Sequence, residues 1–480
     1  MTAMSRLGSL ALVTSAACLS LACWTDPQVV WSPDGRRAAV IGGDGLHVTD
    51  AEGSLSPLLA AGVSRAVWFA DSQRLAVIMR REVPDFSSLA AALGPERTRT
   101  VVDAAEIIWQ QAQAPSAPMD LGDRIMLLTG LGFPFSDDSD DVVTAISWYL
   151  REQYRDAMPP EFAEEELDPL TLNVLVVARL VDDRLEVGAA LYADLGPFVE
   201  IRPAPGGSAV AFVTAAVVGV RAGVLTTYIA SADGTDTARI VATPTAGYPD
   251  WSPDGRSLWY VEALDHDDPE SDIAWLNELE ALDADGHLNL AEHAFRRVGV
   301  RFSTEGRVRL LANGIVMFNA RELHVPALRP DGPAPDHDQL FAFDPARSTL
   351  TTLVPTDQLA RLPRSLAAFE PGPDPAYVLI GGDDGDVLLM SVLDGHIEAF
   401  ATGFTERSRI PMPSWRQAGE FAYLRKAASC IELVLRRGET ERVLSAGWPA
   451  DVLTVKPTYY LDIGVSRPTE LVVDAPAHGE

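Results

Sequence analysis

Two copies of one hexapeptide decide the fold: Trp31-Ser32-Pro33-Asp34-Gly35-Arg36 recurs as Trp251-Ser252-Pro253-Asp254-Gly255-Arg256. An identical hexapeptide at two distant positions indicates internal repetition. Proline presets the first corner of a tight turn, aspartate tolerates the second corner, and glycine supplies the positive φ at the exit. Apolar runs follow at 38–41 and 258–261. Each hexapeptide therefore predicts a turn that leads into a β-strand.

Weaker copies of the same turn precede further apolar runs. They lie at 68–73, 201–207, 302–307, 369–372 and 415–419. A second type of turn, carrying Asp and Gly, separates strand-like runs at 50–53, 233–234 and 394–395. Four short strands in this order cannot bury their own faces, so such units must stack around an axis. Solenoids and β-sandwiches also contain many short strands, but the spacing and the paired turns favour an all-β propeller with six or seven blades.

These repeats resemble the TolB-type propeller repeat, which also occurs in the N-terminal propellers of dipeptidyl-peptidase-IV-like enzymes. The resemblance covers roughly 28–455, apart from one insertion. Six blades are usual in that family, whereas the turns number seven, so both blade numbers stay open. We expect the propeller to occupy 23–475 and a frayed tail to occupy 476–480.

The strand pattern stops within 82–170. Apolar residues recur at helical spacing over 100–113 and again over 142–157. Asp140 and Asp141 suit the positive N-terminal end of the second helix. The segment predicts a helical insertion within an early blade. It caps the central channel, forms a surface for a partner, or is simply packed against the propeller.

Residues 1–22 read as the signal peptide of an exported lipoprotein. Arg6 is followed by an uncharged stretch that is too short for a comfortable membrane span. The stretch ends Leu19-Ser20-Leu21-Ala22-Cys23, which resembles a bacterial lipobox. Cys23 is the predicted lipid attachment site, and Cys18 is a weaker candidate. The resemblance implies an outer-membrane lipoprotein facing the periplasm, while ordinary cleavage with release and an uncleaved anchor are the alternatives.

The net charge of −30 repels phosphate backbones and anionic lipid headgroups, which argues against nucleic acid as a partner. Three cysteines make no disulfide framework. Cys430 begins an apolar run and is predicted to be a buried structural thiol.

No motif for catalysis, cofactor binding or zinc binding stands out. Gly62-Val63-Ser64-Arg65-Ala66 lacks the final glycine of a hydrolase nucleophile elbow, and too few residues follow the last turn for a hydrolase domain. The eight histidines are scattered and are interpreted as surface or satisfied interior residues. Acidic clusters offer oxygen atoms to calcium but lack the twelve-residue loop pattern, so solvated loops are favoured; they lie at 137–141, 265–272 and 383–386. We therefore predict no catalytic, cofactor or metal residues.

Two functions remain. The leading hypothesis is a non-catalytic scaffold that binds an envelope protein or peptide, as the TolB resemblance implies. The alternative is a glycosidase or lyase whose site is assembled from loops at the propeller channel, where no linear motif would reveal it. Several acids converging with Arg or Tyr at the channel would favour the enzyme.

Overall fold

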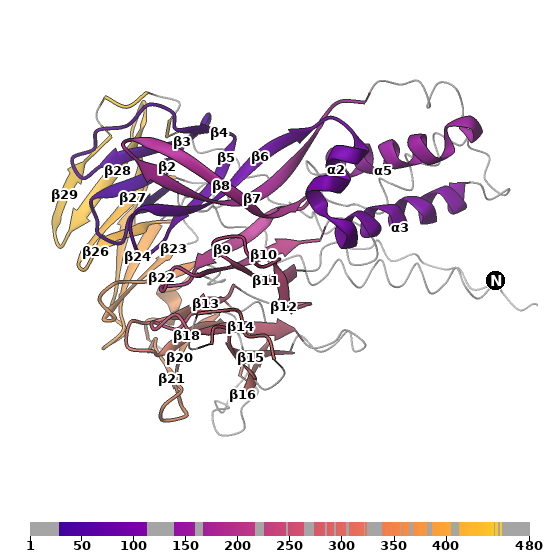
Figure 1. Cartoon of the computed structure of the whole chain (residues 1–480). Coiled ribbons are helices and arrows are strands. Elements are labelled where there is room, and N and C mark those ends of the chain that lie inside the picture. Colours follow the sequence, from indigo (N-terminus) through magenta and orange to yellow (C-terminus); the bar gives the residue numbers. More distant parts are fainter. Residues whose placement is uncertain are drawn as a thin grey trace, which may run out of the picture.

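In a computed structural model, the chain forms seven antiparallel sheets that surround one axis as the blades of a β-propeller (Figure 1). The fold is therefore all-β and seven-bladed in the part of the chain that is described. That part comprises residues 28–112, 139–158, 167–216, 225–245, 248–263, 273–283, 286–291, 294–303, 307–320, 322–323, 338–355, 357–363, 368–381, 386–404, 412–445, 447–449 and 452–453.

Six blades have four strands and one has five, and we number the blades in chain order. Blades 1 to 3 are β1 (Val29–Trp31), β2 (Arg37–Ile41), β3 (Gly45–Asp50), β4 (Ala60–Ala61); β5 (Val63–Trp68), β6 (Arg74–Val83), β7 (Leu170–Val181), β8 (Arg184–Asp194); and β9 (Phe198–Pro203), β10 (Ala209–Ala215), β11 (Leu225–Ser231), β12 (Arg239–Ala242). Blades 4 and 5 are β13 (Asp250–Trp251), β14 (Ser257–Ala263), β15 (Ile273–Glu280), β16 (Phe295–Ser303), β19 (Glu322–Leu323); and β17 (Val308–Leu310), β18 (Val316–Ala320), β20 (Gln339–Asp344), β21 (Thr349–Thr352). Blades 6 and 7 are β22 (Phe369–Pro371), β23 (Tyr377–Gly381), β24 (Asp386–Ser391), β25 (Ile397–Ala401); and β26 (Ser414–Gln417), β27 (Glu420–Lys426), β28 (Ile431–Arg437), β29 (Thr440–Val443).

The two hexapeptides form the predicted turns between the first and second strands of blades 1 and 4. In blade 1 the amide of Ser32 donates to the carbonyl of Arg37 at 2.8 Å, and the amide of Gly35 donates back to Ser32 at 2.8 Å. Gly35 and Gly255 have φ of 67° and 72°, a region that side chains with a Cβ rarely adopt. The repeated hexapeptide thus produces one turn geometry twice, since blade 4 has the same two bonds at 2.7 Å.

Blade 5 has its first internal turn after β17. The copy at 302–307 precedes a strand, as predicted, and that strand, β17, is the first strand of blade 5; residues 304–306 lie outside the described residues. The equivalent turn lies after β17, where the amide of Gly314 donates to the carbonyl of Leu311 at 2.8 Å. This turn, Ala312-Asn313-Gly314, carries none of the Trp or Pro of the repeat.

The core lies between neighbouring blades rather than within any one of them. Side chains on the second strands alternate between two clusters. Ala38 and Val40 pack toward blade 7, while Ala39 and Ile41 pack toward blade 2. Because each such strand is buried on both faces, its sequence is a continuous apolar run.

The ring closes by contact between blades 7 and 1. Ser414 Oγ donates to the carbonyl of Val29 at 2.5 Å, Arg416 Nε donates to the carbonyl of Gly35 at 2.9 Å, and Trp448 Nε1 donates to the carbonyl of Gly53 at 2.6 Å. Among the described strands, every blade is built from its own stretch of chain, apart from β19. Within residues 28–453, the contacts between blades 7 and 1 are made by side chains and packing, and the described strands of these two blades belong to separate sheets.

The insertion in blade 2 is helical, as predicted. Its helices are α2 (Phe86–Leu93), α3 (Pro95–Ala112) and α5 (Ser139–Tyr154), followed by the short 3-10 helix η1 (Arg155–Ala157). We call these helices the arm; they lie together beyond the ends of β6 and β7, at one side of the propeller (Figure 1). Their apolar side chains belong to the same cluster as those between blades 1 and 2.

Polar contacts also hold the arm together. Tyr149 and Tyr154 both donate a hydroxyl to the carboxylate of Glu106, each at 2.6 Å, which ties α5 to α3. Asp141 accepts from the amide of Thr171 at 2.8 Å, which ties α5 to β7.

Two further findings concern single features. Cys430 is exposed, so the prediction of a buried thiol is wrong: the residue lies in the bend before β28, and burial begins further along that strand. None of the described helices combines the length and the apolar character needed to cross a membrane.

Candidate functional site: a charged network across the propeller channel

The first strand of each blade lies closest to the axis. Strands β1, β5 and β9 contact one another in turn, as do β13, β17 and β22, and β26 contacts β1. Three of these strands carry a tryptophan whose indole Nε1 donates to a carbonyl on the first strand of the preceding blade. The pairs are Trp68 with Val30 at 2.9 Å, Trp251 with Arg202 at 2.8 Å and Trp415 with Glu370 at 3.0 Å. These bonds fix the spacing of the blades around the channel.

Charged residues occupy matching positions on four successive first strands. Each stands two residues before the start of its turn, and they come from blades 3 to 6: Arg202, Asp250, Arg309 and Glu370. Glu200 and Arg307 lie two residues further back on β9 and just before β17. We call these six residues the channel network.

The network crosses the channel. Arg202 in blade 3 donates through both terminal nitrogens to the carboxylate of Glu370 in blade 6, at 3.1 and 2.7 Å. Arg309 in blade 5 donates through Nε to Glu370 at 3.0 Å and through Nη2 to Glu200 of blade 3 at 3.2 Å. Because two blades separate blade 3 from blade 6, the first pair spans the axis.

The network is largely withdrawn from water. The side chain of Arg309 is 0% exposed and that of Glu200 is 11% exposed, whereas Glu370 retains 30%. Buried charges are tolerated when each is paired with an opposite charge and hydrogen bonded. Glu370 therefore marks the side of the network that water reaches.

The arginines set the pKa of the two glutamates. Burial acts to raise the pKa of Glu200 and of Glu370, but the neighbouring guanidinium groups, Arg202 first and then Arg309, outweigh it and lower the pKa of each to about 2. Asp250 differs, since burial raises its pKa above the ordinary value despite the same two arginines. Both glutamates are therefore ionised at neutral pH.

A second layer supports the network from blade 5. The guanidinium of Arg307 lies 4.2 Å from the centroid of the Tyr248 ring and 3.7 Å from Glu200 Oε2. Its main-chain amide donates to Asn319 Oδ1 at 2.7 Å. Stacking on an aromatic face stabilises an arginine that water does not reach.

Acids and arginines thus converge at the channel, which is the arrangement that the enzyme hypothesis anticipated. Their bonding, however, gives the glutamates a structural part. A carboxylate with a pKa of about 2 cannot donate a proton near neutral pH, and its oxygens are held by arginine donors.

The residues singled out from the sequence lie elsewhere. Cys23, Cys18 and the signal peptide fall outside the described residues, as do 137–138, 265–272 and 383–384. In the described part of the chain, no group of three or more His, Cys, Asp or Glu is placed to hold a metal ion. Gly62 to Ala66 lies at the start of β5 and not on a strand-to-helix elbow. His47, which is buried, has its ring nitrogens 3.1 Å from the Ser56 carbonyl and 3.0 Å from Asp44, as expected for a satisfied interior histidine.

Sequence reasoning missed the channel network, although a signal for it was present. The stretch Phe198–Pro203 reads Phe-Val-Glu-Ile-Arg-Pro, with two charges inside an otherwise apolar strand directly before a turn. When the turns are aligned, Arg202, Asp250 and Glu370 fall at the same position of the repeat, two residues before the turn begins. Arg309 has no such match in the sequence, because the turn after β17 lacks the Trp and Pro of the repeat.

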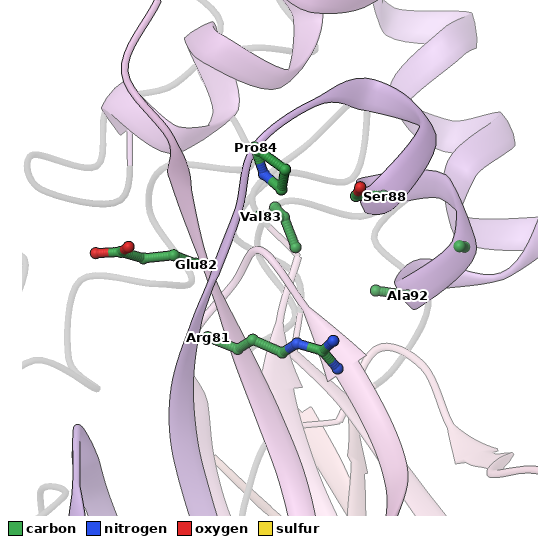
Figure 2. Close-up of a pocket in the computed structure, with 7 residues that line it drawn as sticks. Arg81, Glu82, Val83, Pro84, Ser88 and Ala92 are labelled. Atoms are coloured by element: carbon green, nitrogen blue, oxygen red, sulfur yellow. The ribbon is translucent and has the colours of Figure 1, made fainter.

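A second feature lies at the base of the arm. The end of β6 and the facing side of α2 enclose a partly open hollow of about 370 Å³, which we call the arm-base pocket (Figure 2). Its lining residues are Arg81, Glu82, Val83, Pro84, Ser88, Ala91 and Ala92.

Comparison with known proteins supports the propeller fold and identifies no function. No family model matches the sequence, and no curated protein matches it. Among solved structures, TolB from Acinetobacter baumannii is 13% identical, with a TM-score of 0.37, over 55% of this chain and 57% of that chain. An oligogalacturonate lyase in complex with manganese is 10% identical, with a TM-score of 0.45, over 86% and 89%. An acylaminoacyl peptidase from Pyrococcus horikoshii is 11% identical, with a TM-score of 0.47, over 88% and 52%.

This chain therefore spans a little over half the length of the TolB and peptidase chains. The matches include the propellers that the repeats resemble, and they include enzymes as well. Since one fold serves many functions, the function must be argued from the site.

Proposed function

We propose that this protein is a non-catalytic scaffold that binds a protein or peptide of the cell envelope. The observation that carries the proposal is the pairing of the channel carboxylates: Glu200 and Glu370 are held by Arg202 and Arg309, and the Arg202–Glu370 pair spans the axis. A network of this kind stiffens the ring of blades. With the channel occupied by this network, the outer surface and the arm are the parts that distinguish this protein from a plain propeller.

We further propose that the protein is exported and held on a membrane through a lipid on Cys23, facing the periplasm from the outer membrane. Support comes from the leader 1–22, with its single arginine, its uncharged stretch and its closing cysteine. More than one acyl chain is needed for stable anchoring, which lipidation of that cysteine would provide. Nothing in this part of the proposal depends on the propeller.

The experiment is affinity capture from the native host. The tagged protein is expressed from its own leader, crosslinked in living cells, extracted with detergent, and its co-purifying proteins are identified by mass. An unrelated acidic lipoprotein is the control, because the charge of −30 alone attracts basic proteins. Enrichment of one or two envelope proteins over the control is expected. No enrichment across repeated crosslinking would contradict the scaffold.

The convergence of acids and arginines at the channel favours the alternative, a glycosidase or lyase, and Asp250 adds a second observation. The carboxyl of Asp250 has a raised pKa and lies in the field of Arg202 and Arg309, a setting in which a carboxylic acid can serve as a proton donor. Two contacts argue for a structural part instead: Asp250 accepts from the amides of Trp251 at 3.0 Å and Leu310 at 2.9 Å. Turnover of a polysaccharide by the wild type and its loss in Asp250→Asn, with the fold retained, would establish the enzyme.

A further inference from the structure

The arm-base pocket is lined by an exposed arginine, Arg81. Arg81 and Val83 extend toward α2, whereas Glu82 points to the opposite side of the strand (Figure 2). Among the described residues, the guanidinium of Arg81 has neither an ion pair nor a hydrogen bond. In a chain with a net charge of −30, an unpaired arginine in a concave site is a place where an anionic group gains a favourable contact.

The main chain beside the pocket is also open. Strand β5 begins at Val63, opposite Met79, and the last bond on that side runs from the amide of Arg80 to the carbonyl of Gly62 at 2.9 Å. Strand β6 continues to Val83 and pairs there with Leu170 of β7. Among the described strands, residues 81–83 are therefore paired on one side only.

Strand geometry says which groups face the open side. Main-chain groups alternate between the two neighbours of a strand, and those of Arg80 face β5. The amide and carbonyl of Glu82 must then face the open edge. An unpaired strand edge accepts an extended peptide by main-chain hydrogen bonds.

The open edge is short, which limits what fits. It spans three residues and stops at Pro84, whose nitrogen carries no hydrogen to donate. A long peptide strand would extend beyond the unpaired main chain, whereas the last few residues of a chain could pair with it along their whole length. The pocket walls beside the edge are small and apolar: Val83, Ala91 and Ala92.

We propose that the arm-base pocket binds the C-terminal end of a peptide. The terminal carboxylate pairs with Arg81, the last side chain is short and aliphatic and packs against Ala91 and Ala92, and the main chain bonds to Glu82 along the edge of β6. This inference rests on the proposed binding function and names the site and the ligand chemistry.

Fluorescence polarisation tests it with labelled hexapeptides that share one uncharged polar body and end in Ala, Val, Leu or Asp. Each is made with a free carboxylate and with a terminal amide. We expect the free acids ending in Ala or Val to bind, with affinity reduced about tenfold or more by amidation, by Arg81→Gln, and by N-methylation of the amide that faces Glu82. The matched control is Arg80→Gln, which removes the same charge from the neighbouring residue on the opposite face of β6.

Three results would overturn the inference: equal binding of acid and amide, equal loss with Arg80→Gln and Arg81→Gln, or no binding by any free acid at about 1 mM protein. Envelope capture separates this failure from failure of the scaffold. If Arg81→Gln still captures the partner and no peptide binds, the pocket is wrong and the scaffold stands. If the wild type captures nothing, the scaffold itself is wrong.

Discussion

Replacing Glu370 by Gln tests the structural role of the channel network. The carboxylate accepts two bonds from Arg202 and one from Arg309. Gln keeps one oxygen acceptor and loses the charge, so two buried guanidinium groups lose their shared counter-charge. Removing one partner of a buried ion pair costs about 3 to 5 kcal/mol. Since the Glu370 side chain is 30% exposed, we expect the lower end, about 3 kcal/mol.

The assay is urea denaturation followed by tryptophan fluorescence and by circular dichroism, with coincident transitions required before a free energy of unfolding is extracted. The control is Glu280→Gln. Glu280 is 57% exposed and lies 4.0 Å from an exposed arginine, so the change should cost less than about 0.5 kcal/mol. If Glu370→Gln changes the free energy of unfolding no more than the control does, the reasoning about the network is refuted.

The free energies of unfolding of the wild type and of Glu370→Gln should also depend differently on pH. The pKa of Glu370 is lowered to about 2 in the folded protein, against about 4.3 for an unfolded glutamate. A depressed folded pKa contributes stability that is complete above the unfolded value and is lost as the pH falls toward the folded value. The difference in free energy of unfolding between wild type and Glu370→Gln should therefore narrow from pH 5 down to about pH 2 to 3. A difference that stays constant over this range would contradict the assignment.

Three other predictions test the ring, the arm and the anchor. Trp251→Phe should cost about 1 kcal/mol more than Trp31→Phe, because the indole of Trp251 donates to a carbonyl of the preceding blade, whereas that of Trp31 is buried and has no acceptor among the described residues; equal losses in urea denaturation would contradict this. Glu106→Gln weakens both tyrosine bonds between α3 and α5, so amide exchange in α3 should speed up while the blades stay protected; unchanged exchange in α3 would count against it. Cys23→Ala should abolish incorporation of radiolabelled palmitate in the native host, and Cys18→Ala should leave it intact; labelling that persists without Cys23 would remove the anchor.

The turn chemistry explains how much of the fold was predictable. Pro, Asp and Gly at 33–35 and 253–255 act through local backbone preferences, so a turn follows from the sequence alone. The number of blades does not, because it depends on how seven similar sheets pack around one axis. Blade 5 shows the limit: its real turn, Ala312-Asn313-Gly314, has the glycine without the flanking signature.

The repeat position of the charged residues can be read from the sequence, but their pairing across the channel cannot. Arg202 and Glu370 are 168 residues apart, and nothing local indicates that they meet. Only the closed ring brings blades 3 and 6 to opposite sides of one channel. The exposed Cys430 was misjudged because the apolar run that follows it was extended by one residue into the bend before β28.

Parallel capture by the wild type and by Glu370→Gln tests the central claim most directly. Both proteins are expressed in the native host, shown to be folded by circular dichroism, crosslinked and purified side by side with the unrelated acidic lipoprotein. If the channel network is structural and the protein is a binding scaffold, both enrich the same envelope protein over the control. Capture by neither protein, or loss of capture with the folded Glu370→Gln variant, would contradict the account.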